Sequence, residues 1–190
     1  LVQNSYAKVP IEGDPAPNFS LTSVAGKKIS LSDLKGKTVL VGMFHICVPC
    51  MKQALEFNKV RDQLSSTKLT ILGINTSGDS KASVMDYLNG FPENVKFSYL
   101  LDPDQSVHKN YSQRDMPTVL VIDSKGVIQA RVPWVGADQM VKFLKKLFGK
   151  SGPPCDVVID KKELFRVKPF DLFDNFFHRS CSELLSKKGC

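Results

Sequence analysis

Two cysteines, Cys47 and Cys50, have two residues between them and lie where an apolar stretch is followed by a helical pattern. Residues 38–43 form an apolar run that is typical of a buried strand, and the helical pattern opens at Met51. The first sulfur is then expected at a helix N-terminus, where unpaired N–H groups and the helix dipole favour the thiolate. A thiolate attacks disulfides, and a second thiol one turn later can close a small ring and release the product. The spacing therefore predicts a reversible redox pair.

Zinc binding and an inert structural disulfide are the competing interpretations of this pair. A structural zinc site needs about four ligands, usually with a second Cys or Cys/His pair at short spacing. The other candidate ligands are isolated or widely spaced along the chain: His45, His108, His178, Cys155, Cys181 and Cys190. Redox chemistry is therefore favoured, and the sequence predicts neither a metal site nor a cofactor.

Length and composition predict one domain of ordinary size with an appendage. The chain has 190 residues, and its hydrophobic fraction of 42% is enough for a sizeable core. The formal net charge is +7, but Lys and Arg are spread along the whole chain, which argues against nucleic-acid binding. No apolar run approaches the roughly 18–20 residues that span a bilayer.

The chain begins at Leu1 and holds an odd number of cysteines. The first feature leads us to expect a preceding segment, either a signal peptide or a membrane anchor. Three of the five cysteines lie near the C-terminus, which indicates a disulfide-permissive compartment.

The hydrophobic pattern predicts an α/β fold with a mixed central sheet flanked by helices. Strands are expected at 19–24, 28–31, 38–43, 69–75, 95–100, 118–122 and 127–132, and a helical turn at 32–37 ends at Gly36. Four helices are expected. The first begins at residue 51, with Met51, Leu55, Val60 and Leu64 on its apolar face, and the second follows an N-cap at Asp79 or Ser80. The third covers 107–111, and the fourth covers 138–148 and ends before Gly149. Parallel crossovers would place the cysteines beyond the carboxyl end of a strand.

Four segments resemble the TlpA/ResA-like group of extracytoplasmic thiol–disulfide oxidoreductases. They are GDPAPNFSL (13–21), CVPC (47–50), GINTSGDSKASVMDYL (73–88) and DMPTVLVIDSKGVI (115–128). The resemblance covers roughly residues 12–149. It implies a thioredoxin-like fold with an N-terminal β-hairpin, which we assign to residues 1–150. The Ser-Gly-Pro-Pro stretch at 151–154 reads as a linker, so residues 151–190 are predicted to be a C-terminal, Cys-containing extension beyond the resemblance.

The resemblance also implies roles for individual residues. Cys47 would be the nucleophile, Cys50 the resolving thiol and Pro117 a cis-proline that faces the disulfide. Asp79 falls where the family often has an acidic residue, commonly Glu, that handles a proton near the buried cysteine. Substrate is expected to bind at Met116, whose backbone could pair with an extended chain, and at Val48 and Pro49.

Several of these positions have other readings. Asp79 could instead be a helix cap, and Pro117 an ordinary proline that opens a strand. His45 could favour the Cys47 thiolate, but a strand-end residue that packs elsewhere is the better prediction. The chain also departs from the family at Ile46, where many members have Trp before the first cysteine.

The predicted function is disulfide exchange with protein substrates in the periplasm or at the outer face of the cytoplasmic membrane. The resemblance implies a reductant that is coupled to a membrane electron donor or acceptor, while the sequence itself leaves the direction open. Two alternatives keep the same dithiol: a thiol peroxidase, and a non-enzymatic, copper-binding assembly factor.

The C-terminal extension carries apolar residues at helical spacing: Phe170, Phe173, Phe177, Cys181 and Leu184. We expect this amphipathic helix to cover an apolar patch of the core, and a partner-binding helix is the alternative. The three cysteines there allow three single pairings, among which Cys155–Cys181 closes the longest loop without the terminal residue.

Overall fold

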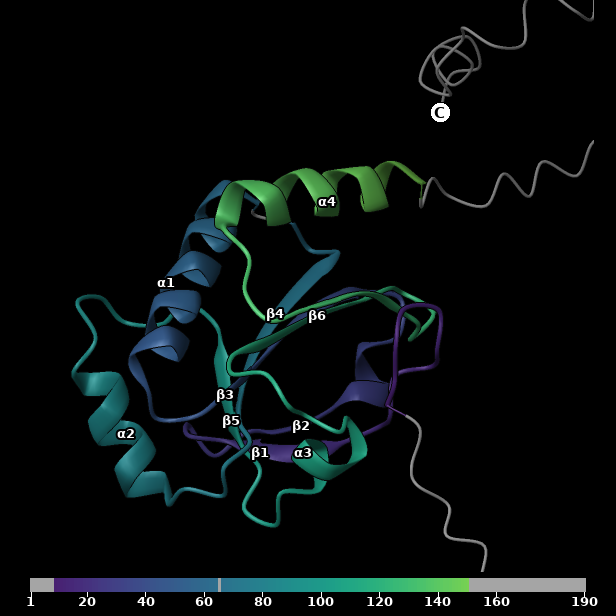
Figure 1. Cartoon of the computed structure of the whole chain (residues 1–190). Helices are drawn as coiled ribbons and strands as arrows, with labels where there is room; N and C mark the ends of the chain where they lie inside the picture. Colours follow the sequence, from purple (N-terminus) through teal and green to yellow (C-terminus); the bar gives the residue numbers. More distant parts are fainter. Residues whose placement is uncertain (1–8, 65, 151–190) are drawn as a thin grey trace, which may run out of the picture. The chain divides into compact units, whose positions relative to one another are not determined.

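The computed structural model describes residues 9–64 and 66–150 (Figure 1). The predictions for the helix, the strand and the disulfide within 151–190 lie outside the described residues. The described part contains a seven-stranded sheet with the strand order β2-β1-β5-β4-β3-β6-β7. Its strands are β1 (Ser20–Ser23), β2 (Lys28–Ser30), β3 (Thr38–Phe44), β4 (Leu69–Asn75), β5 (Ser98–Leu101), β6 (Thr118–Ile122) and β7 (Ile128–Val132).

The sheet is mixed, as predicted. Strands β3, β4 and β5 run parallel to one another, whereas β6 is antiparallel to β3 and pairs with β7 in a hairpin. The predicted N-terminal hairpin is β1–β2, which joins the sheet because β1 pairs antiparallel with β5. The strand that precedes the cysteines is therefore paired on both sides.

Helices cover both faces of the sheet. They are α1 (Val48–Gln63), α2 (Lys81–Asn89), α3 (Ser106–Asn110) and α4 (Ala137–Lys150), with a 3-10 turn, η1, at Leu31–Leu34. Figure 1 shows α1 and α4 together on one side of the sheet and α3 on the other. Side chains of α1, α2 and α4 share one buried cluster, and side chains of η1 and α3 belong to the second.

Strand β3 supplies both clusters because its side chains alternate between the two faces. Leu40 and Phe44 enter the cluster beneath α1, while Val41 and Met43 enter the opposite one. Gly42 is required within the strand, because a Cβ atom there would lie 2.1 Å from the ring of Phe44. The apolar run read from the sequence is therefore a strand that is buried on both faces.

The buried face of α1 differs from the predicted one. Ala54, Phe57 and Val60 are buried, whereas Met51 and Leu55 are only partly buried. Two polar side chains, Gln53 and Asn58, also lie on the buried face, each hydrogen-bonded to backbone of another segment. The prediction is confirmed at Val60 and wrong at Met51 and Leu55, because hydrophobic periodicity does not include polar residues that are buried with a partner.

Two predicted boundaries are also corrected. The third parallel strand, β5, begins at Ser98 rather than at residue 95. The side chain of Asn58 donates to the carbonyl of Asn94 and accepts from the N–H of Lys96, so this backbone pairs with a helix instead of a strand. Helix α4 runs through Gly149 to Lys150 instead of ending before it.

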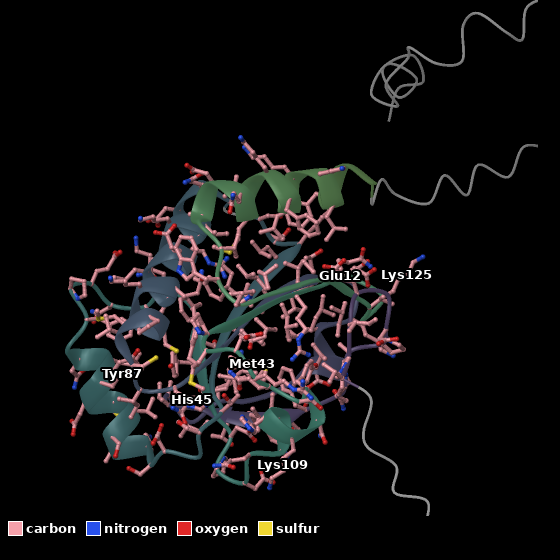
Figure 2. All side chains as sticks on the ribbon, in the orientation of Figure 1. Glu12, Met43, His45, Tyr87, Lys109 and Lys125 are labelled. Atoms are coloured by element: carbon pink, nitrogen blue, oxygen red, sulfur yellow. The ribbon has the colours of Figure 1, made fainter. Side chains whose placement is uncertain are left out.

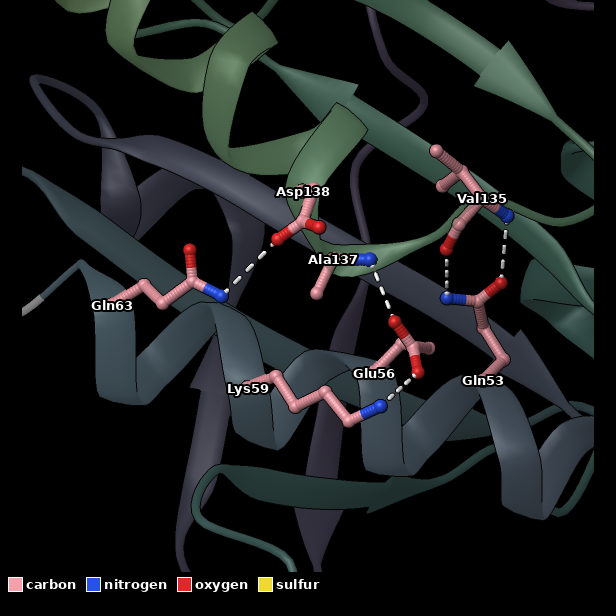
Figure 3. A network of polar contacts seen from close by, with 7 residues as sticks. All are labelled: Gln53, Glu56, Lys59, Gln63, Val135, Ala137 and Asp138. Carbon is pink, nitrogen blue, oxygen red and sulfur yellow. Dashed lines mark hydrogen bonds and ion pairs between the residues drawn. The ribbon is translucent and has the colours of Figure 1, made fainter.

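Polar contacts join α1 to the start of α4 (Figure 3). The carboxamide of Gln53 both donates to and accepts from the backbone of Val135, at 2.9 Å in each case. The Glu56 carboxylate accepts the N–H of Ala137, the first residue of α4, at 2.7 Å. Glu56 thus satisfies an N–H that has no partner within its own helix.

Among the described residues, no helix is both long and apolar enough to cross a membrane.

Replacing Glu56 by Ala should lower the free energy of unfolding by about 1 kcal/mol, because a helix N-terminus loses its acceptor. Lys59→Ala is the matched control. This change removes the ion-pair partner of Glu56 but leaves the cap in place. The Lys59 side chain is mostly exposed, so its ion pair should contribute little to stability. Urea unfolding of the two variants measures both effects, and equal losses would contradict the capping role.

Candidate active site

The dithiol lies where β3 gives way to α1. Cys47 is the N-cap of α1, in an extended conformation, and Val48 and Pro49 form the start of the helix. The helix therefore begins three residues earlier than its apolar pattern indicated. The Sγ atom of Cys47 accepts the backbone N–H of Cys50 at 3.4 Å. A sulfur in this position has the N–H environment that favours a thiolate.

The two sulfurs differ in environment. Cys47 is partly buried and Cys50 is 1% exposed, and both are free thiols. The Sγ atom of Cys50 accepts the backbone N–H of His45 at 3.3 Å. Burial, followed by the hydrogen bond with Cys47, raises the pKa of Cys50 to about 12. The first thiol is thus accessible, while the second is held protonated behind it.

Pro117 lies beside the end of β3 because β6, which it precedes, pairs antiparallel with β3. The register places Thr118 opposite Met43. The peptide bond between Met116 and Pro117 is cis, as the family resemblance implied. Met116 is 39% exposed, and among the described residues its backbone makes no hydrogen bond. Its N–H and carbonyl are therefore available to another chain.

A buried polar network orders the segment before Pro117. The amide of Gln113 donates to the carbonyls of Met43 and Asp115, each at 3.2 Å. Thr76, which follows β4, donates its hydroxyl to Gln113 at 2.6 Å and its N–H to the carbonyl of Phe44 at 3.0 Å. The ends of β3 and β4 and the segment before β6 are thereby joined.

Asp79 is not the cap of α2. Ser80 is the N-cap, and its hydroxyl accepts the N–H of Ser83 at 3.1 Å. The Asp79 carboxylate accepts from the amide of Asn75 at 2.9 Å and from the hydroxyl of Ser77. It holds the loop between β4 and α2.

Asp79 also acts on a histidine in this region. Its charge raises the pKa of His45. Overall the pKa of His45 is lowered, first by burial and then by the neighbouring His108. The two rings lie 6.1 Å apart between centroids. His45 therefore packs against another histidine at the end of the sheet, in line with the prediction of a packing role.

Sequence reasoning missed three groups at this end of the sheet. They are Gln113, His108 and Tyr87, whose hydroxyl donates to the carbonyl of Cys47 at 2.6 Å. Figure 2 shows Tyr87 and His45 at the end of the molecule where α1 begins. Each comes from a segment far from the cysteines in sequence, so no local motif could have indicated it.

Within the described part of the chain, no group of three or more His, Cys, Asp or Glu side chains could hold a metal ion. The chemistry available at this site is that of two thiols with unequal exposure. One can attack a disulfide from a helix N-terminus, and the other can complete the exchange from behind.

A dithiol at the start of the helix that follows the central strand, with a cis-proline beside it, defines a thioredoxin-fold redox protein. A model described as the AhpC/TSA family matches residues 12–131, more than half of the chain. The chain belongs to that family, and the predicted kinship with ResA-like proteins is confirmed by the relatives below.

Thiol-disulfide oxidoreductase ResA of Bacillus subtilis is 32% identical over 131 residues, which cover 68% of this chain and 72% of ResA. A provisionally named peroxiredoxin, bcp, of Coxiella burnetii is 32% identical over 140 residues, or 66% of this chain and 90% of that protein. The crystal structure of StoA from Bacillus subtilis matches with a TM-score of 0.59 at 23% identity, and covers 70% of this chain and 98% of StoA. This last likeness confirms the predicted thioredoxin-like fold.

The pKa of His45 should shift in opposite directions when either of two neighbouring residues is replaced. Asp79→Asn should lower the pKa of His45 further, because it removes the charge that raises it. His108→Asn should raise that pKa, because it removes a neighbouring positive charge. NMR titration of the ring, assigned with His45→Asn, measures both. Shifts of the same sign in the two variants would contradict the arrangement.

Proposed function

We propose that this protein exchanges disulfides with protein substrates through Cys47 and Cys50, outside the cytoplasm, and that it acts as a reductant. The observation that carries the proposal is the contrast between the two sulfurs. Cys47 accepts a helix N-terminal N–H at the surface, and Cys50 is buried behind it with a raised pKa. A thiol kept protonated does not compete for the substrate, so the first attack falls to Cys47.

The reaction runs in two steps. The Cys47 thiolate attacks one sulfur of a substrate disulfide, the substrate S–S bond breaks, and its other sulfur leaves as a thiolate that takes up a proton. Cys50 then loses its proton and attacks the Cys47 sulfur of the mixed disulfide. The substrate leaves as a dithiol with two more electrons, and Cys47 and Cys50 form a disulfide. A membrane electron donor would restore the dithiol.

The surroundings of Cys47 support a polypeptide substrate. Ile46, Val48 and Met116 are apolar side chains with 41%, 58% and 39% of their surface exposed. Pro49 completes the start of α1 beside them. The backbone of Met116 has no hydrogen-bond partner within residues 9–64 and 66–150, so it can form strand-like hydrogen bonds with an extended chain, while the apolar side chains contact its residues.

Relatives support the disulfide exchange, the family resemblance supports the direction, and cysteine usage supports the location. ResA, whose name states thiol–disulfide oxidoreductase activity, is 32% identical to this chain. The TlpA/ResA-like resemblance carries the reductant role, and the additional cysteines near the C-terminus fit a compartment in which disulfides persist. We further propose that Asp79 acts on proton transfer indirectly, through its effect on His45.

Peroxide reduction is the second candidate, favoured by one observation. The bcp protein, named as a peroxiredoxin, is 32% identical over 140 residues. A peroxidase would consume hydrogen peroxide rapidly in the presence of a reducing system and lose that activity in Cys47→Ser. Disulfide exchange predicts peroxide consumption no faster than that of an ordinary thiol, together with rapid insulin reduction. Peroxide electrode and insulin turbidity assays on the same preparation distinguish the two functions.

The roles of the two cysteines can be tested by trapping. Cys50→Ser should accumulate mixed disulfides with other proteins, because Cys47 can attack but the resolving thiol is gone. Cys47→Ser should trap none at this site, and both variants should reduce insulin at the background rate. Non-reducing electrophoresis with peptide mapping identifies the linked cysteine. Trapping by Cys47→Ser alone would reverse the assignments.

A further inference from the structure

The carbonyl of Cys47 accepts two hydrogen bonds. One comes from the N–H of Met51 at 3.1 Å and is the first bond of α1. The other comes from the hydroxyl of Tyr87 at 2.6 Å, on α2. Cys47 is therefore held on both sides, because its sulfur accepts one N–H and its carbonyl accepts two donors. Among the described residues, Tyr87 provides the only side-chain donor to that carbonyl.

Tyr87 is also the polar link between α2 and the dithiol. Val84 is the one fully buried residue of α2, so the helix is anchored by few side chains. The Tyr87 ring packs edge-on against Phe91, with the ring centroids 4.9 Å apart. The Tyr87 side chain thus contacts Phe91 through its ring and the start of α1 through its hydroxyl.

The hydroxyl stays protonated and lies within electrostatic reach of both sulfurs. Burial raises the pKa of Tyr87 above its ordinary value and outweighs the hydrogen bond with Cys47, which lowers it. Tyr87 is therefore a permanent donor over the working pH range. In the structure it donates to the peptide unit that carries the attacking thiol.

We propose that Tyr87 is a positioning residue for the disulfide exchange, which holds the Cys47 peptide at the start of α1 and thereby sets the reactivity of its thiolate. A role of Tyr87 in catalysis rests on the proposed function, but the effect of Tyr87 on the Cys47 thiol can be measured independently of that function. Through this contact α2, an element distant from the cysteines in sequence, tunes the dithiol.

The direction of the effect follows from the dipole of the hydroxyl. Its positive end faces Cys47, so it favours a negative charge on that residue. A favoured thiolate stabilises the dithiol form relative to the disulfide. Removing the hydroxyl should therefore make the Cys47 thiol less reactive and shift the equilibrium toward the disulfide.

The test compares Tyr87→Phe with Tyr111→Phe in the full chain. Tyr111 is a matched control, because its buried hydroxyl also donates to a backbone carbonyl, that of Pro17 at 2.7 Å, away from the dithiol. Three quantities are measured: the iodoacetamide alkylation rate of Cys47 at pH 7, located by peptide mapping; the dithiol–disulfide equilibrium with glutathione; and the thermal melting temperature.

Tyr87→Phe should slow alkylation and shift the equilibrium toward the disulfide by roughly threefold to tenfold, the range that the loss of one hydrogen bond corresponds to. Tyr111→Phe should leave both unchanged, even if it lowers the melting temperature equally. Replacement of Tyr87 by 3-fluorotyrosine, a more acidic donor, should shift both quantities the opposite way.

Wild-type values in Tyr87→Phe, or equal changes in Tyr111→Phe, would overturn the inference. If the wild type fails to reduce insulin, the proposed function is wrong, yet the alkylation rates still decide whether Tyr87 positions Cys47.

Discussion

The pairing of β3 on both of its sides is the constraint on which the dithiol depends. Parallel pairing with β4 places the segments after the two strands at one edge, and antiparallel pairing with β6 brings the start of β6 to the same edge. Three segments distant in sequence thus converge at Cys47. The buried bonds of Gln113 and Thr76 join them, and such bonds are costly to break in a site that excludes water.

Within that frame, one helical turn creates two chemically different thiols. Cys47 is the cap, so its sulfur faces the unpaired N–H groups of the helix. Cys50 lies within the helix, on the face that packs against the sheet, so it is buried among core residues. The asymmetry needs no charged partner for either sulfur, since burial is the largest cause of the raised pKa of Cys50. Position along α1 thus separates attack from resolution.

The segment from β4 to α2 adds control that a bare dithiol would lack. Asp79 and Asn75 shape the loop after β4, and Tyr87 extends from α2 to the carbonyl of Cys47. Val84 is the one fully buried residue of α2, and the Tyr87 hydroxyl gives this helix a directional contact with the site. A contact of this kind can alter the reactivity of a thiol without altering the core.

The sequence alone determined the dithiol, the buried strand before it, the hairpins and the mixed α/β class, because each depends on local pattern or spacing. The family resemblance added Pro117 and its cis bond. Only the tertiary structure decided which face of α1 is buried and where β5 begins, since Asn58 satisfies backbone groups of a distant segment. It alone revealed Tyr87 and Gln113 at the site, and the hydrogen bonds of Asp79 within the loop after β4. These depend on which segments meet in space, and long-range hydrogen bonds between single side chains and backbone leave no periodic signal in a sequence.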